Sequence, residues 1–150
     1  MPDREVLSAP HAIEYPYDRT VGPVMGRFFT SLRDRRIEGV RTADGRVLVP
    51  PTEYDPVTSA AVGDFVEVGP AGVVTTWSWV HHVRPGKHPL DRPFAFALIR
   101  LDGADTALLH AVDAGDPSAM TTGMRVEARW RDERQGHIRD LECFVPEGAS

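Results

Sequence analysis

The sequence predicts a mainly β protein with one N-terminal helix, a short hairpin unit and a small barrel. Three observations support this fold class. Valine occurs 17 times, against 9 leucines and 4 isoleucines, and β-branched side chains favour strands. The 13 glycines and 13 prolines indicate many turns. From Gly63 onward, short alternating or fully apolar segments follow one another, as the strands of a sheet do.

Residues 1–36 are predicted to form an arm and an amphipathic helix. The Pro-rich segment 1–17 shows no period, which favours an arm along the body or along a partner. Pro23 suits the first helical position, the helix is expected to run to Arg36, and Gly39 is expected to terminate it. Five apolar side chains form one stripe on this helix, and we expect them to contact a partner protein: Val24, Met25, Phe28, Phe29 and Leu32.

Residues 37–60 are predicted to form a compact hairpin unit. The run Thr42-Ala43-Asp44-Gly45 is typical of a tight turn, because Asp-Gly readily supplies positive φ angles. Residues 47–49 then form a short strand, which Pro50-Pro51 stops because proline cannot donate to a ladder.

Residues 61–150 are predicted to form a barrel of five or six strands. The expected strands lie at residues 64–68, 72–83, 94–101, 106–112, 124–130 and 138–145. Met124, Val126, Ala128 and Trp130 alternate with charged residues and are expected to point inward. A small closed or partly closed barrel of this kind, with uneven loops, is typical of an OB-fold.

Composition excludes several classes of protein. A single cysteine, Cys143, rules out a disulfide framework and any zinc site built from several thiolates, and it is expected to be a buried, inert thiol. The net charge of −5 argues against a broad surface for nucleic-acid phosphates. The chain begins Met-Pro-Asp-Arg-Glu without an apolar segment, and its longest apolar stretch is too short for a membrane span. A cytoplasmic protein is therefore expected.

The long strand at residues 72–83 carries the candidate binding surface. Trp77, Trp79 and His81 lie two apart and so share one face. We expect this face to be outward, because the small side chains Val74, Thr76, Ser78 and Val80 suit the barrel interior. The loop that follows adds Arg84 and Lys87, which suit a phosphate or an acidic partner. The alternative interpretation is that the two tryptophans fill the core.

Histidines leave an enzyme open as an alternative. His81 or His82 with Asp91 or Asp113 would be an acid–base pair, although no spacing requires it. His81 and His82 are adjacent on a strand and cannot chelate one metal together, but one of them with His88 or His110 is a candidate metal or acid–base pair. A single-stranded nucleic-acid-binding protein is the other alternative, because OB-folds offer aromatic stacking platforms.

The order of elements resembles the DUF35 family of zinc-ribbon plus OB-fold proteins. Members typically carry Cys-x-x-Cys-Gly, then Pro-Pro, then a second Cys-x-x-Cys before the barrel. The corresponding text here is Arg41-Thr42-Ala43-Asp44-Gly45, Pro50-Pro51 and Tyr54-Asp55-Pro56-Val57. The glycine and the prolines remain, whereas the four presumed ligand positions are Arg41, Asp44, Tyr54 and Val57. The resemblance therefore implies a ribbon held by packing instead of zinc.

The resemblance also implies a function. Family members are non-catalytic subunits that accompany thiolase-like acyl-CoA enzymes of lipid and steroid metabolism: thiolases, condensing enzymes or steroid side-chain retro-aldolases. They stabilise the partner and help to shape its acyl-CoA channel. On this basis we expect a hetero-oligomer with no catalytic residue, no metal and no cofactor bound by this chain alone. Acyl-CoA, as a ligand of the complex, is expected near Trp77, Trp79, His81, Arg84 and Lys87.

We predict that the purified protein contains no stoichiometric zinc. The positions that resemble zinc ligands hold no thiolate, and Asp44 with a distant histidine is a poor tetrahedral set. Elemental analysis after dialysis against a chelator should find far less than one zinc per chain. One zinc per chain would contradict the prediction.

Overall fold

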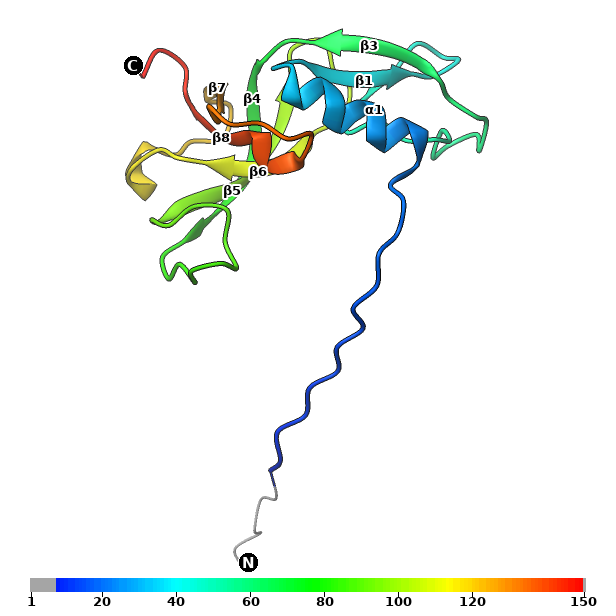
Figure 1. Ribbon diagram of the computed structural model, residues 1–150. Coiled ribbons are helices and arrows are strands. Elements are labelled where there is room, and N and C mark those ends of the chain that lie inside the picture. The colour runs from blue at the N-terminus through cyan, green and yellow to red at the C-terminus, as the bar shows by residue number, and fades with distance from the viewer. Residues whose placement is uncertain (1–7, 150) are drawn as a thin grey trace, which may run out of the picture.

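The computed structural model describes residues 8–149 and confirms the mainly β fold class (Figure 1). A five-stranded closed barrel and a three-stranded sheet share one helix. The elements are α1 (Gly22–Arg33), β1 (Ile37–Arg41), β2 (Val47–Leu48), β3 (Asp64–Val68), β4 (Ala71–Val80), β5 (Phe94–Leu101), β6 (Leu108–Val112), η1 (Pro117–Ala119), β7 (Arg125–Trp130), η2 (Ile138–Asp140) and β8 (Leu141–Pro146). No helix among residues 8–149 is long and apolar enough to cross a membrane.

The barrel closes in the order β4-β5-β6-β8-β7. Its neighbouring strands are antiparallel except β6 and β8, which meet in parallel where Val112 pairs with Phe144. Small and branched side chains fill the interior, among them Val74, Ala97 and Ile99. Val126 is buried, and the predicted inward residues Ala128 and Trp130 pack on the same core. This arrangement agrees with the OB-fold expected from the sequence.

A β-bulge at Thr75 overturns the predicted facing of β4. Val74 pairs with Ile99 and Thr76 with Leu98, so Thr75 is an extra residue between two register pairs. An extra residue reverses the alternation beyond it. Thr76 and Ser78, expected inward, are therefore exposed, whereas Trp77 and Trp79 are half-buried against the barrel core. The prediction that both tryptophans face outward is wrong for this reason.

The three-stranded sheet has the order β2-β1-β3. Residues 64–68 are predicted as a barrel strand, and this prediction is wrong. Strand β3 pairs instead with β1 along its whole length, from Ile37 opposite Val68 to Arg41 opposite Asp64. Gly39 does not end the helix but lies in the middle of β1. A Cβ there would lie 2.6 Å from the Leu48 carbonyl oxygen, so only glycine fits beside β2.

The sheet is joined to the barrel through the loop between β5 and β6. Asp105 accepts a hydrogen bond from the Val47 amide (2.7 Å), and its own amide donates to the Val47 carbonyl (2.8 Å). The Thr106 hydroxyl accepts a hydrogen bond from the Val49 amide (2.7 Å) and donates one to the Val49 carbonyl oxygen (3.0 Å). The edge of β2 is therefore satisfied by the barrel rather than left open.

Helix α1 ends three residues earlier than predicted, because Arg35 adopts a positive φ of 58° and the Arg36 amide turns back to the Ser31 carbonyl (2.9 Å). Its stripe is largely core. Val24, Phe28 and Leu32 are buried, whereas Met25 and Phe29 are only half-buried. Three of the five side chains expected to contact a partner are thus packed inside this chain.

A buried carboxylate fixes the helix to the sheet. Glu38 on β1 receives two hydrogen bonds from the Arg27 guanidinium, at 2.9 and 3.1 Å, and a third from Ser31. Arg27 also lies 4.1 Å from the centre of the Phe65 ring. The hydrogen bonds from Arg27 hold the pKa of Glu38 below its usual value, although burial opposes this. An unpaired carboxylate there would be costly, so the pair sets the position of α1.

Phe28 and Phe29 provide a matched test of the two sides of α1. We predict that Phe28→Ala destabilises the chain by about 3–5 kcal/mol, as expected for a fully buried phenylalanine. Phe29→Ala should cost much less, because that ring is half-exposed. Urea unfolding measures both free energies. Equal losses of unfolding free energy in the two variants would contradict the difference in burial between Phe28 and Phe29.

Candidate functional site

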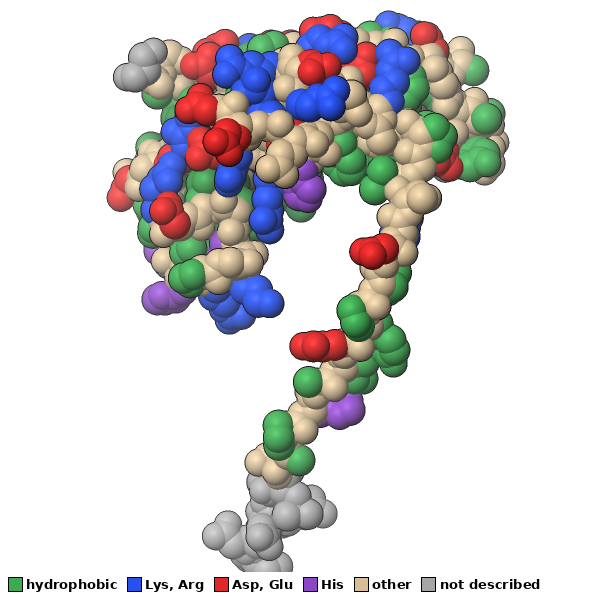
Figure 2. All heavy atoms as spheres, viewed as in Figure 1, with side chains coloured by type: hydrophobic (Ala, Val, Ile, Leu, Met, Phe, Trp, Pro, Cys, Tyr) green, Lys and Arg blue, Asp and Glu red, His purple; other side chains and the backbone are tan. Residues whose placement is uncertain are grey.

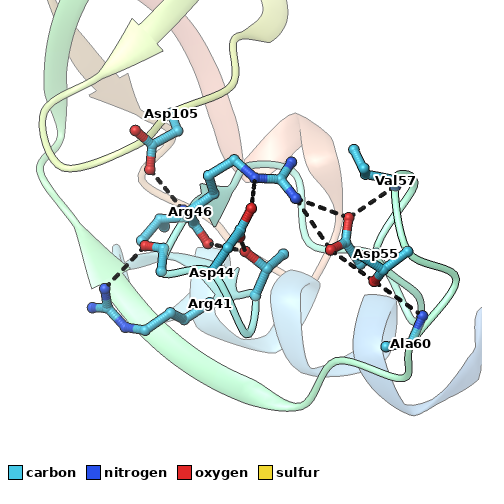
Figure 3. Close-up of polar contacts among 11 residues, drawn as sticks. Arg41, Asp44, Arg46, Asp55, Val57, Ala60 and Asp105 are labelled. Carbon is cyan, nitrogen blue, oxygen red and sulfur yellow. Dashed lines mark hydrogen bonds and ion pairs between the residues drawn. The ribbon is translucent and has the colours of Figure 1, made fainter.

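Two loops of the hairpin unit meet where the family resemblance places zinc ligands. Arg46 lies between them (Figure 3): its Nε donates to Asp44 at 2.8 Å, and its Nη2 lies 3.1 Å from both carboxylate oxygens of Asp55. Asp55 also accepts from the Val57 amide (2.9 Å) and from the Thr58 hydroxyl (3.0 Å). Charge pairing and loop hydrogen bonds thus connect residues 44–46 to residues 55–58.

Both aspartates of this network are held in the ionised form. The Arg46 side chain lowers the pKa of Asp44 to about 2. The Val57 amide does most to lower the pKa of Asp55, with Thr58 and Arg46 adding to it against the effect of burial. Two of the other presumed ligand positions, Tyr54 and Val57, are exposed. No group of three or more His, Cys, Asp or Glu side chains able to hold a metal occurs in residues 8–149.

The predicted ligand surface is brought together only in part. Trp79 and His81 lie edge to face, with ring centres 6.4 Å apart, and His81 is exposed. Both tryptophans pack on the barrel core. Arg84 and Lys87 share one turn of the following loop, where the Lys87 amide donates to the Arg84 carbonyl (3.1 Å). Both cations are exposed, so the surface keeps an aromatic part and a cationic part on consecutive segments.

The residues of the enzyme alternative do not form a catalytic pair. The Asp113 carboxylate forms ion pairs with Arg92 Nη2 at 2.6 Å and with Arg129 Nη2 at 3.0 Å. Burial opposes its ionisation, but the two arginines outweigh burial and keep the pKa of Asp113 below its usual value. An ionised, doubly paired carboxylate is a weak base. No hydrogen bond joins His81 or His82 to Asp91 or Asp113 within residues 8–149.

Cys143 is buried under the loop that precedes β5, in a small cluster with Leu90 and Phe94. Burial raises the pKa of its thiol to about 11, so the thiolate is not populated near neutral pH. The predicted burial of the thiol is confirmed.

Two hollows adjoin at the end of the barrel where β6 and β8 diverge. The larger, about 520 Å³, is mostly polar and is bordered by Trp130, His137 and Glu133. The smaller, about 250 Å³, has apolar walls that include Phe96 and Leu109. Both are lined by Arg131, Arg139 and Glu142, so they border on each other. Of the five predicted ligand residues, only Lys87 lines either of these hollows.

His110 and His88 both line the smaller cavity. His110 is buried edge to face against Phe144, with ring centres 5.6 Å apart, and its Nδ1 has no hydrogen-bond partner within residues 8–149. Burial lowers its pKa, so the ring is neutral near pH 7. His88 is oriented by the Arg84 amide, which donates to its Nδ1 at 3.0 Å.

Sequence reasoning missed the cavity because its walls come from distant segments. Arg131 and Arg139 lie in a charged run, Arg131 to Asp140, that reads only as a solvated loop. Asp140 organises this run by accepting from the backbone amides of residues 135–137, at 2.6 to 3.1 Å. In the sequence, Gly136 and Asp140 indicate only that the chain turns here.

Comparison with known proteins identifies the barrel. Residues 65–131 match the family model described as ChsH2, C-terminal OB-fold domain. This match supports a DUF35 family assignment. The matched segment begins in β3 and ends just after β7, so it covers most of the OB-fold barrel. No curated protein sequence matches the chain.

Two solved structures share the fold of this chain. One is a DUF35 family protein of unknown function from Sulfolobus solfataricus, with 24% identity, a TM-score of 0.57, and 71% of this chain and 78% of that chain covered. The other is a chain of the Ltp2-ChsH2(DUF35) aldolase, with 22% identity, a TM-score of 0.64, and 86% of this chain and 98% of that chain covered. At these identities the likeness concerns the fold.

The large exposed apolar side chains of residues 8–149 lie in three separate regions. One is the arm, where every residue from 8 to 21 is exposed and which runs away from the body in Figure 1. Its Ile13, Tyr15 and Tyr17 alternate with polar residues or proline, and the two tyrosines are 78% and 74% exposed. The second region is the loop of Tyr54 and Val57, and the third is the pair of leucines at 98 and 109.

The Arg46–Asp55 contact can be tested against pH. We predict that Asp55→Asn lowers the Tm by several degrees, whereas Asp44→Asn, at a more exposed carboxylate, lowers it less. Because the folded pKa of Asp55 is depressed, its contribution is present above the unfolded pKa of about 3.9 and is lost as the pH falls through the folded value.

The Tm difference between wild type and Asp55→Asn should therefore be largest at neutral pH and shrink below about pH 4. Calorimetry across this range measures it. A difference that does not change with pH would show that the charge of Asp55 does not hold the loops.

Proposed function

We propose that this chain is a non-catalytic subunit that binds and stabilises a thiolase-like acyl-CoA enzyme and helps to form its acyl-CoA channel. The observation that carries the proposal is the likeness to a chain of the Ltp2-ChsH2(DUF35) aldolase, which extends over nearly the whole of that chain. The name of that aldolase pairs a DUF35 component, ChsH2, with a second component, Ltp2. The partner's thiolase-like identity and the acyl-CoA ligand are inferences that go beyond it.

The chemistry within the chain is consistent with a supporting role. Asp113 is paired with Arg92 and Arg129, and burial keeps the Cys143 thiol protonated near neutral pH. Neither feature supplies an activated nucleophile or a free general base. A partner enzyme would then supply the chemistry, and this chain would supply surface.

The arm is the segment best suited to contact the partner. In an extended segment, side chains two apart lie on the same face, so Ile13, Tyr15 and Tyr17 form one apolar row. No hydrogen bond within the described residues ties residues 8–20 to the body. Tyrosine is favoured at interface hot spots because it buries a large ring and keeps a polar tip. Met25 and Phe29 on the half-exposed side of α1 would extend this surface.

The acyl-CoA surface remains the predicted one in this proposal. His81, Arg84 and Lys87 are exposed next to the half-buried Trp79 and would face the partner's substrate entrance. A nucleotide thioester brings an aromatic base and phosphates, which suit an aromatic edge followed by two cations.

We predict that the tagged chain, expressed in its native cell, co-purifies in fixed ratio with a thiolase-like subunit and that acyl-CoA turnover needs both. Replacing Tyr15 and Tyr17 with serine should weaken the complex at least about tenfold, a loss typical of interface hot spots. The isolated variant should remain folded, because the arm is exposed.

Tyr54→Ser is the matched control, since Tyr54 is also exposed but lies on the hairpin unit. It should leave the affinity unchanged. Purification of the chain alone, or turnover by the single chain, would contradict the proposal. Salt-dependent binding of a single-stranded oligonucleotide would favour the alternative function instead.

A further inference from the structure

We propose that the cavity beneath η2 binds a small anion that carries an apolar chain, such as an alkyl carboxylate or an alkyl phosphate. The cavity of about 250 Å³ lies between the loop of Lys87, the exposed edge of β6 and the segment that leads into β8. This proposal concerns the isolated chain and does not depend on a partner subunit.

The cavity's apolar walls continue onto the outer face of the barrel. Phe96 and Leu109 border the cavity, and Leu109 is 61% exposed. Its cross-strand neighbour Leu98 is 37% exposed. Two exposed leucines side by side on a barrel present apolar surface to water, which is unfavourable unless something covers it. A short alkyl chain entering the cavity along Leu109 would cover part of this surface.

Three cations from two segments line the same cavity: Lys87, Arg131 and Arg139. None of them has a carboxylate within 4.0 Å in the described part of the chain, unlike Arg92, Arg125 and Arg129. The one acidic side chain in the lining, Glu142, is paired with Arg129 at 2.9 Å. Figure 2 shows Lys and Arg side chains both on the barrel face and on the loop below it. An anionic group is the complementary ligand.

His110 adds a polar group that the fold leaves unsatisfied. It lines the cavity and is 8% exposed, and its Nδ1, an atom that is itself buried, has no hydrogen-bond partner within residues 8–149. A buried polar atom without a partner costs free energy, which a bound group can recover. Neutral imidazole has one donor and one acceptor nitrogen, so a carboxylate or phosphate oxygen that reaches the ring would accept a hydrogen bond from its N–H.

The volume limits the size of the ligand. Pockets for drug-sized molecules measure roughly 300–1,000 Å³, so 250 Å³ accommodates a short chain or the end of a longer one. Four probes separate the two required properties: octanoate and octyl phosphate carry both charge and chain, octanol has only the chain, and inorganic phosphate has only the charge.

NMR titration of the isolated chain with these probes tests the proposal. Octanoate or octyl phosphate should shift the methyl signals of Leu109 and the ring signals of His110, and the tighter of the two identifies the preferred head group. Octanol and inorganic phosphate should bind at least about tenfold more weakly, which corresponds to about 1.4 kcal/mol. Equal binding of octanol, or shifts confined to residues outside the cavity, would overturn the proposal.

Charge variants provide a second test of the proposal. The double variant Lys87→Gln/Arg139→Gln should weaken binding of the better probe about tenfold. Both side chains are exposed, so their loss removes no buried contact. Arg100→Gln is the matched control, because Arg100 is exposed on β5 outside the cavity lining. Unchanged affinity in the double variant, or an equal loss in the control, would overturn the assignment of the head group to this cavity.

Discussion

The burial of one face of α1 positions most of what surrounds the candidate sites. Phe28 and Leu32 belong to the same core as the barrel residues Val112 and Phe144, so the helix is shared by both parts of the chain. The charged loop before β8 then docks on the helix: His137 stacks on Phe29 with ring centres 6.3 Å apart, and Arg134 donates to the Arg33 carbonyl at 2.8 Å. Because this loop also carries Arg131 and Arg139, the position of the helix determines where those cations meet the cavity.

Charge pairs and hydrogen bonds hold the loops of the hairpin unit together. Arg46 bridges two carboxylates, and the backbone around Asp55 closes on itself through the Asp55 amide and the Ala60 carbonyl (2.8 Å). Hydrogen bonds from Asp105 and Thr106 fix β2 to the barrel. Many weak contacts, several of them to the barrel, therefore hold these loops in place.

Much of the fold could be predicted from local patterns, whereas the site could not. Alternation in Met124 to Trp130 predicts a barrel strand because one face must be apolar. The bulge at Thr75 carries no glycine or proline to signal it, yet it reverses the facing of both tryptophans. The pairing of β3 with β1 and the convergence of Lys87 with Arg139 depend on contacts between distant residues, which periodicity does not encode.

We propose above that this chain binds a partner enzyme and contributes part of the surface of the complex. Hydrogen–deuterium exchange, measured on the chain alone and on the complex purified from its native cell, tests this most directly. The account predicts that amides in residues 8–21 exchange rapidly in the free chain and are protected in the complex, while the barrel strands are equally protected in both. Rapid exchange of the arm in both samples would contradict it.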